Sequence, residues 1–218
     1  MCFSPGADVV VGGIVVVIGV DALRHVREPK QILLASLPLL FGLHQIDEAF
    51  VWWGLQGHVA ESIERVAVWV YVLFALAALP ALVPIAVLGV ERSASRRRLI
   101  GALAVLGIGV GVALGVALFR GSVNAAIGGR HIAYDASALA QGRELTALYV
   151  VAACGALIAS SYRDLAALGL LNLVAVPVLM WMTVSGFISL WCFWAAIVSV
   201  VIDFHMRRTS AGRLAHVT

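Results

Sequence analysis

Seven runs of mostly apolar residues constrain this chain more than any other feature of its sequence. They lie near 7–24, 31–55, 64–90, 99–119, 144–161, 164–184 and 186–206. A helix of about 20 apolar residues crosses the hydrocarbon core of a bilayer. The pattern therefore predicts an all-α integral membrane protein, a single domain over 1–218 with seven transmembrane helices and one long loop at 120–143.

The composition indicates that the solvent and main partner of this chain is a lipid bilayer. Hydrophobic residues make up 62% of the 218 residues and charged residues 12%, whereas a soluble domain has about 45–50% and about 25%. A chain of this size cannot bury so much apolar surface in water. The composition thus excludes soluble enzymes, disordered proteins and nucleic-acid-binding proteins, and the three cysteines are too few for a disulfide scaffold.

The basic residues predict the orientation of the helices, because cytoplasmic loops are enriched in Lys and Arg. One side of the predicted bundle holds the first, third and fifth loops and the C-terminus. It carries all of the 15 basic residues except Arg65, Arg120, Arg130 and Arg143. We therefore expect the N-terminus outside, the C-terminus in the cytoplasm and the 120–143 loop outside.

The second apolar run carries an unusual group of polar residues. His44, Asp47 and Glu48 are spaced i, i+3 and i+4, so they share one face of a helix. Ionisable groups within the membrane are costly and usually face a bundle interior or a wet cavity. The functional hypotheses are a metal site, a proton relay or a polar ligand pocket, with Glu48 facing the interior. The alternatives are a buried structural network, or carboxylates that reach the outer headgroups.

The aromatic residues favour a pocket in the outer half of the bundle. The predicted topology places all six tryptophans there: Trp52, Trp53, Trp69, Trp181, Trp191 and Trp194. An interfacial aromatic belt explains some of them, but a belt on one side only favours an aromatic-walled pocket that opens outward. The ligand-binding residues expected in this pocket are Gln45, Trp52, His131, Tyr134 and Trp191.

Five residues at the same predicted depth could ligate a metal, namely His44, Glu48, His131, Cys2 and Cys192. Imidazole, carboxylate and thiolate ligands suit zinc, copper or iron, although the long-range spacing matches no compact metal motif. With a metal bound, His44 and Glu48 become the candidate catalytic residues, and Glu48 would act as general base toward a metal-activated water. We expect Cys2 and Cys192 to share one outer cavity and Cys154 to pack passively.

The inner face carries a second polar group, which we interpret as juxtamembrane anchors: Asp21, His25, Asp203 and His205. Asp203 and Arg207 are four residues apart on one helix, and Arg24 can reach Asp21. A haem held by His25 and His205 is the alternative. Covalent retinal is excluded as a cofactor, because its Schiff base needs a lysine and the single lysine, Lys30, lies in an inner loop.

Small residues and prolines predict details of the packing. Gly107, Gly111 and Gly115 form a stripe on the fourth run that allows close backbone approach. We expect this stripe to pack within the monomer rather than to form a homo-oligomer face. The prolines Pro80, Pro84 and Pro177 are expected to kink their helices.

Several short motifs resemble an uncharacterised family of bacterial seven-helix membrane proteins. They are Met1-Cys2-Phe3-Ser4, His44-Gln45-Ile46-Asp47-Glu48 with Trp52, His131-Ile-x-Tyr134 and Trp191-Cys192-Phe193. Members of that family begin Met-Cys-Phe-Ser-Ala and carry Gln-Gln-x-x-Glu-Gly in helix two. This chain departs from them at Pro5, His44 and Ala49. The resemblance implies a seven-helix protein of the inner (plasma) membrane. It gives no information about the activity.

A weaker resemblance, in architecture only, is to the alkaline-ceramidase and adiponectin-receptor hydrolases, which hold an intramembrane zinc. Their last helix carries a His-x-x-x-His pair, where this chain has only His205. Three function classes therefore stay open. The first is a protein that binds a metal or small ligand and could be a metal-dependent hydrolase. The second is a small-solute or proton-coupled transporter or channel, and the third is an accessory subunit of a larger membrane complex.

Overall fold

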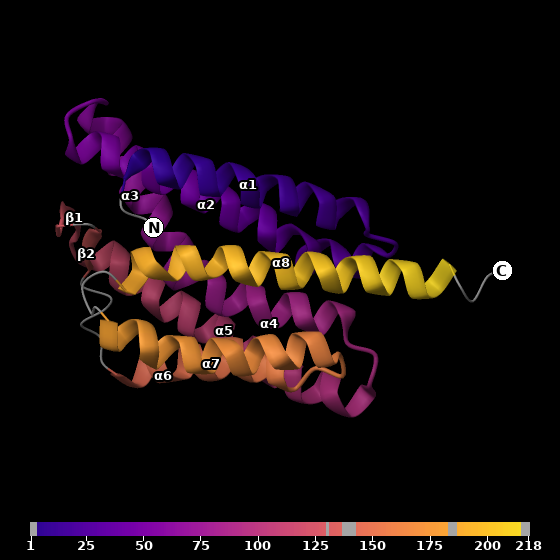
Figure 1. Ribbon diagram of the computed structural model, residues 1–218. Helices are drawn as coiled ribbons and strands as arrows, with labels where there is room; N and C mark the ends of the chain where they lie inside the picture. Colours follow the sequence, from indigo (N-terminus) through magenta and orange to yellow (C-terminus); the bar gives the residue numbers. More distant parts are fainter. Residues whose placement is uncertain (1–3, 130, 137–142, 183–186, 215–218) are drawn as a thin grey trace.

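The computed structural model describes residues 4–129, 131–136, 143–182 and 187–214. Within them the chain forms seven continuous helices, which lie side by side, and one β-hairpin (Figure 1). In chain order the elements are α1 (Pro5–Arg24), the 3₁₀ turn η1 (Pro29–Gln31), α2 (Ile32–Leu55), α3 (Glu61–Val72), the π-helix η2 (Leu73–Ala78), α4 (Leu79–Val90), α5 (Ala94–Arg120), β1 (Val123–Ile127), β2 (Ile132–Ala136), α6 (Arg143–Ile158), α7 (Arg163–Met182) and α8 (Phe187–Leu214).

Four of the helical segments in the described part of the chain are long and apolar enough to cross a membrane. They are Pro5–Arg24, Pro29–Leu55, Glu61–Val90 and Ala94–Arg120. The last of these begins after the N-cap Ser93, and α1 begins after Ser4, whose side chain accepts a hydrogen bond from the Ala7 amide at 3.3 Å. These segments match the first four predicted runs.

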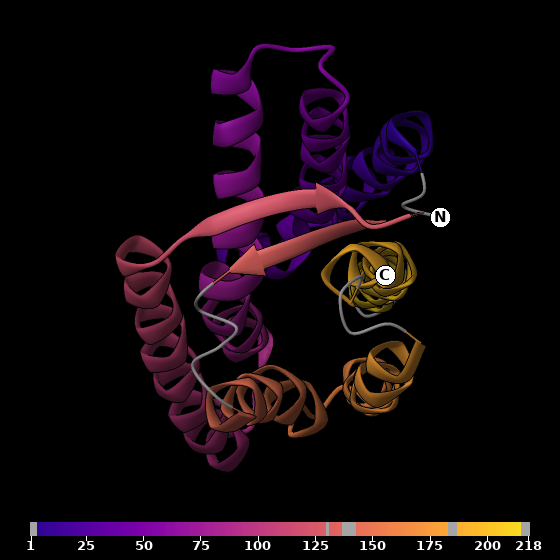
Figure 2. The same cartoon turned by 90° about the vertical axis from the view of Figure 1, so that its left-hand side faces the viewer.

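The 120–143 segment corrects one prediction, because part of it is a β-hairpin rather than a loop. β1 and β2 pair antiparallel, with Val123 opposite Ala136 and Ile127 opposite Ile132. Gly129 adopts a positive φ of 76° in the turn, a conformation that suits glycine. Figure 2 shows the hairpin lying across one end of the helices. We call this end the hairpin end, and the end with the α1–α2, α4–α5 and α6–α7 connections the loop end.

Glycines let α1 and α2 pack with their backbones in contact. A Cβ on Gly12 would meet the Gly42 carbonyl at 2.9 Å, and one on Gly42 would meet the Val16 amide at 2.6 Å. A Cβ on Gly19 would overlap the backbone of Leu39. The α1–α2 pair forms the most extensive helix contact in the bundle. Its close approach brings the first turn of α1 against the polar face of α2.

The predicted glycine stripe packs inside the chain. A Cβ on Gly107 would overlap the Pro80 carbonyl, and one on Gly111 would overlap the Ala77 carbonyl. α5 therefore lies directly against η2 and α4. This is the packing that the small residues predicted.

The π-helix η2 ends two residues before Pro80. A proline offers no backbone N–H to the preceding turn, and π-turns relieve such mismatches within helices. The Tyr149 hydroxyl of α6 donates to the Ala75 carbonyl at 2.9 Å, so a carbonyl of the widened turn is satisfied from a neighbouring helix. A π-helix thus precedes Pro80, a form that the sequence did not indicate, while Pro84 and Pro177 lie inside the α-helices α4 and α7.

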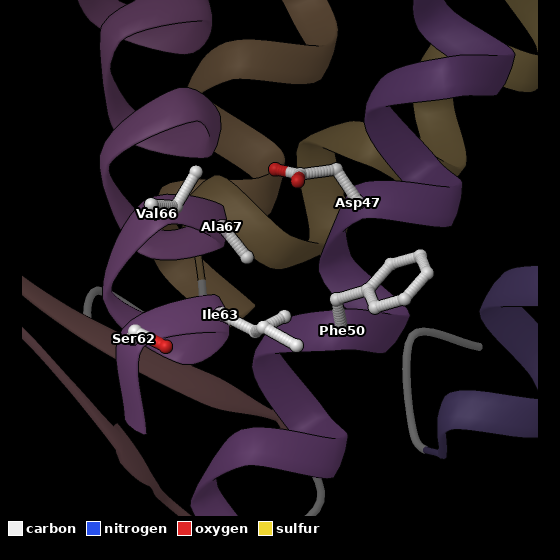
Figure 3. Close-up of a pocket in the computed structure, with 6 residues that line it drawn as sticks. All are labelled: Asp47, Phe50, Ser62, Ile63, Val66 and Ala67. Carbon is white, nitrogen blue, oxygen red and sulfur yellow. The ribbon is translucent and has the colours of Figure 1, made fainter. Parts of the chain in front are cut away.

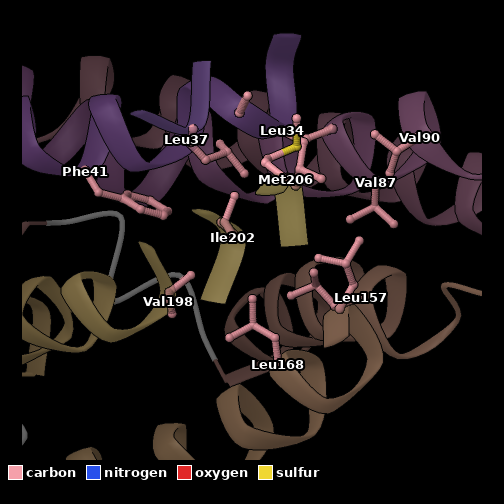
Figure 4. Packing of buried hydrophobic residues seen from close by; sticks show 14 of the residues in the cluster. Leu34, Leu37, Phe41, Val87, Val90, Leu157, Leu168, Val198, Ile202 and Met206 are labelled. Carbon is pink, nitrogen blue, oxygen red and sulfur yellow. The ribbon is translucent and has the colours of Figure 1, made fainter. Parts of the chain in front are cut away.

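An apolar core fills the middle of the bundle (Figure 4). Its buried side chains come from six helices: Val15, Leu34, Leu37, Phe41, Val87, Leu157, Leu168, Val198, Ile202 and Met206. Polar residues gather on either side of this core, at the hairpin end and at the loop end.

Candidate functional site

The polar face of α2 is buried at the hairpin end. Glu48 is 0% exposed and Gln45 2% exposed, and His44 and Trp52 are buried beside them. Their spacing places all four on the side of α2 that packs against the bundle, while Leu43 and Phe50 are exposed on its other side. Glu48 therefore lies within the bundle and does not extend toward its surface.

An aromatic stack surrounds His44. Its ring is stacked on Tyr71 with centroids 4.0 Å apart, and the Phe74 ring lies 4.7 Å away at a tilt of 43°. Tyr71 in turn stacks on Tyr134 of β2 at 4.6 Å. The aromatic rings cover the imidazole of His44, so its two nitrogens can reach a partner only in the plane of the ring, at the edge of the stack. In the described part of the chain the buried Nδ1 of His44 has no hydrogen-bond partner.

Asp8 is a member of this cluster that sequence reasoning missed. It lies in the first turn of α1 and is 0% exposed. Gln45 Nε2 donates to its Oδ1 at 3.5 Å. The signal was present, since Asp8 is the one acid between Met1 and Val20, and an acid within an apolar span is usually functional.

We define the hairpin-end cluster as these buried residues: Asp8, His44, Gln45, Glu48, Trp52, Tyr71 and Tyr134. It joins three of the predicted ligand-binding residues, Gln45, Trp52 and Tyr134, to both candidate catalytic residues. The buried indole Nε1 of Trp52 also has no hydrogen-bond partner among the described residues. The cluster thus presents donors and acceptors inside an aromatic wall.

The remaining predicted site residues are placed differently. His131 lies in the turn of the hairpin, with its Nε2 beside Gly128 and its carbonyl accepting from the Gly128 amide at 2.8 Å. The side chains of Cys2, Trp191 and Cys192 lie outside the described residues. Cys154 is a free, buried cysteine of α6.

A cavity of about 340 Å³ lies between α2 and α3, on another side of α2 from the cluster (Figure 3). Asp47 points from α2 across this cavity, whose other walls include Phe50, Ile63, Val66 and Ala67. The buried Oδ2 of Asp47 has no hydrogen-bond partner within the described ranges. An acid in apolar surroundings therefore borders a space large enough for a small ligand.

The loop end holds the predicted anchors. Arg207 Nε donates to Asp203 at 2.8 Å, as the spacing predicted. Asp21 pairs with Arg207 at 2.7 Å, and no pairing with Arg24 is seen in the described part of the chain. One group of three potential ligands among the described residues has its ligand atoms within 4.8 Å of one another, and it is Asp21, His25 and Asp203. The guanidinium of Arg207 pairs with both carboxylates of this group, Asp21 and Asp203, in the place where a metal ion would bind them.

A second polar contact at the loop end, between Glu91 and Ser161, joins the α4–α5 connection to the α6–α7 connection. Glu91, which follows α4, accepts hydrogen bonds from the Ser161 amide at 2.7 Å and the Ser161 hydroxyl at 2.6 Å. It also accepts from the amides of Arg92 and Ser93 at 2.9 and 2.8 Å. Burial alone would raise the pKa of Glu91, but these hydrogen bonds outweigh it and hold that pKa below its usual value.

Comparison with known proteins gives a family and no activity. A family model described as a family of unknown function, DUF6629, matches residues 1–217. No curated protein and no solved structure matches the chain.

Proposed function

The chain belongs to the DUF6629 family, whose function is unknown, and we propose that it is a seven-span membrane protein that binds a small cation at the hairpin-end cluster. The observation that carries the proposal is the burial of Asp8, His44 and Glu48 among the apolar residues of α1 and α2. Ionisable groups at such positions usually serve binding or transport. The cavity at Asp47 adds an acid to the same region.

The charge of the site favours a cation over an anion. The ionisable groups that α1 and α2 bring to the hairpin end are three acids, Asp8, Asp47 and Glu48, and one histidine. Carboxylates with an imidazole bind metal ions, and carboxylates with aromatic faces bind ammonium groups. Trp52, which is buried beside Glu48, supplies such a face. A divalent metal and an organic ammonium share this chemistry, and the experiment below separates them.

The apolar core favours a binding site over a continuous path for ions. Its side chains, from Phe41 near the hairpin end to Met206 at the loop end, separate the hairpin-end cluster from the polar groups of Asp21 and Asp203. A transporter that kept this arrangement would have to move ions through an apolar layer. A site reached from one side fits the distribution better.

The orientation is part of the proposal. With seven spans and the N-terminus outside, the hairpin end faces the exterior and the loop end the cytoplasm of the inner (plasma) membrane. A reporter fused after Thr218 is expected to be cytoplasmic, and one inserted at 137–142 to be external, as measured by protease or thiol-reagent accessibility in intact cells. Both reporters on one side would refute the seven-span arrangement.

Cation binding is expected to raise the midpoint of thermal unfolding, because a ligand that binds only the folded state stabilises it by about 2.7 kcal/mol at 100 times its Kd. The purified protein in detergent is heated with zinc chloride, with tetramethylammonium chloride, and with sodium sulfate as the anionic control. We expect one cation to raise the midpoint of the parent and to have no effect on Glu48→Gln, which keeps the shape of the side chain.

The matched control is Glu144→Gln, because Glu144 is an exposed acid at the start of α6. This variant is expected to respond like the parent. The proposal fails if neither cation shifts the midpoint, or if Glu48→Gln responds as the parent does.

A further inference from the structure

The loop end contains a cavity of about 570 Å³ that the proposed cation site does not use. Its walls come from four parts of the chain that are distant in sequence. They are η1, the α4–α5 connection, the α6–α7 connection and the C-terminal part of α8, and they contribute among others Lys30, Arg92, Arg97, Tyr162, His205 and Thr209. We call this space the loop-end cavity. The loop end is on the right-hand side of Figure 1.

Three basic side chains border this cavity. Arg97 is held in place, because its Nη1 donates to the carbonyls of Leu88 at 2.9 Å and Glu91 at 3.0 Å. Those acceptors carry no formal charge, so the guanidinium keeps its positive charge uncompensated by them. Lys30 and Arg92 make no ion pair or side-chain hydrogen bond among the residues that the structure describes. The cavity therefore has one fixed cation and two that can turn toward a ligand.

The acids around the cavity are already engaged. Glu91 is 2% exposed, and its carboxylate accepts from Ser161 and from the amides of Arg92 and Ser93. The side chain of Glu28 takes part in a capping box with Gln31 at the start of η1. Asp164 contacts His205 at 3.1 Å and Arg208 at 3.3 Å. Neutral donors occupy the carboxylates that line the cavity, Glu28 and Glu91, without cancelling their charge. Three basic side chains against these two acids leave one positive charge in excess, and the basic groups keep donors for a ligand.

We propose that the loop-end cavity binds a phosphate group. Guanidinium and ammonium donors converging from separate elements are the usual means of recognising phosphate. Phosphate can reach this site as the headgroup of an anionic phospholipid, since basic pockets between helices at a membrane surface bind such headgroups, or on a phosphorylated solute. The site is independent of the hairpin-end cluster, and neither proposal needs the other.

The test compares the parent protein with the double variant Lys30→Gln, Arg92→Gln. Neither side chain makes a described bond, so the substitutions should leave the fold intact, and an unchanged thermal midpoint without ligand checks this. Arg98→Gln removes a basic residue of the same segment that does not line the cavity. Binding is measured by native mass spectrometry with phosphatidylglycerol in mixed micelles, and by thermal shift with inorganic phosphate.

We expect the parent and Arg98→Gln to bind one of these probes, and the double variant to bind it roughly tenfold more weakly or worse. Retention of phosphatidylglycerol without a response to inorganic phosphate identifies a lipid headgroup as the ligand. The reverse pattern identifies a soluble phosphate compound. The proposal is overturned if the parent binds neither probe, or if Arg98→Gln loses as much binding as the double variant.

Discussion

Replacing Glu91 with alanine is expected to lower the free energy of unfolding by about 3–5 kcal/mol. The Glu91 carboxylate accepts four hydrogen bonds at 2.9 Å or less, from Ser161, Arg92 and Ser93, and the Ser160 hydroxyl lies 3.4 Å from its Oε2. Removing the carboxylate leaves these donors without their acceptor, and each buried unsatisfied group costs about 1–3 kcal/mol. It also separates the α4–α5 connection from the α6–α7 connection.

The same contact predicts the pH dependence of stability. The pKa of Glu91 is lowered in the folded protein, so the carboxylate stabilises the fold fully above its unfolded pKa. That contribution is lost as the pH falls through the lowered folded pKa. In denaturant titrations the parent should lose stability on acidification, and Glu91→Ala should lose less over the same interval.

The control for this prediction is Glu61→Ala. Glu61 also accepts a short contact, from Arg65 at 2.6 Å, but its side chain is 82% exposed. An exposed pair of this kind is worth about 0–1 kcal/mol. Equal destabilisation by the two substitutions would show that the Glu91 contact does not join the loops as described.

Substituting Gly19 with isoleucine is expected to destabilise the protein by about 3 kcal/mol or more. Adding atoms to a packed interior typically costs about 1–3 kcal/mol. The cost is at the upper end here, because even a Cβ on Gly19 would overlap the Leu39 backbone, which cannot turn aside as a side chain can. The separation of α1 from α2 would also move Asp8 away from Gln45.

Gly13→Ile provides a matched control on the same helix. A Cβ on Gly13 meets nothing within 4 Å, so this substitution adds the same side chain at an open position. We expect Gly13→Ile to retain the thermal midpoint and the folded yield of the parent in detergent. A Gly19→Ile protein as stable as Gly13→Ile would contradict the close α1–α2 packing.

The sequence predicted most of the helices because their apolar runs are long and their ends carry charges or caps. It also predicted the packing of Gly107 and Gly111, since only small residues allow helices to approach so closely. The hairpin was missed, although the Gly128-Gly129 pair lies between two short segments of β-compatible residues, a pattern typical of a hairpin. This pattern is short and weak beside the long apolar runs on either side of it, so the segment was interpreted as a loop.

The candidate site was only partly predictable. The spacing of His44 and Glu48 places them on one face of α2, and the helical period alone determines that. The contribution of Asp8 depends on how α1 packs on α2, and the contribution of Tyr71 depends on a stack with His44 and Tyr134 that spans three elements. Such contacts between distant segments are set by tertiary packing, which no local pattern encodes. Nothing is described of the side chains of the predicted ligands Cys2 and Cys192.

The central claim, a single cation site at the hairpin-end cluster, is tested most directly by calorimetric titration. The purified parent and Glu48→Gln proteins are titrated in detergent with zinc chloride and with tetramethylammonium chloride, and the heat of binding is measured. The account predicts a saturable isotherm with one site per chain for one of the two cations in the parent, and no binding heat in Glu48→Gln. An absence of saturable binding in the parent, or the same isotherm in both proteins, would contradict it.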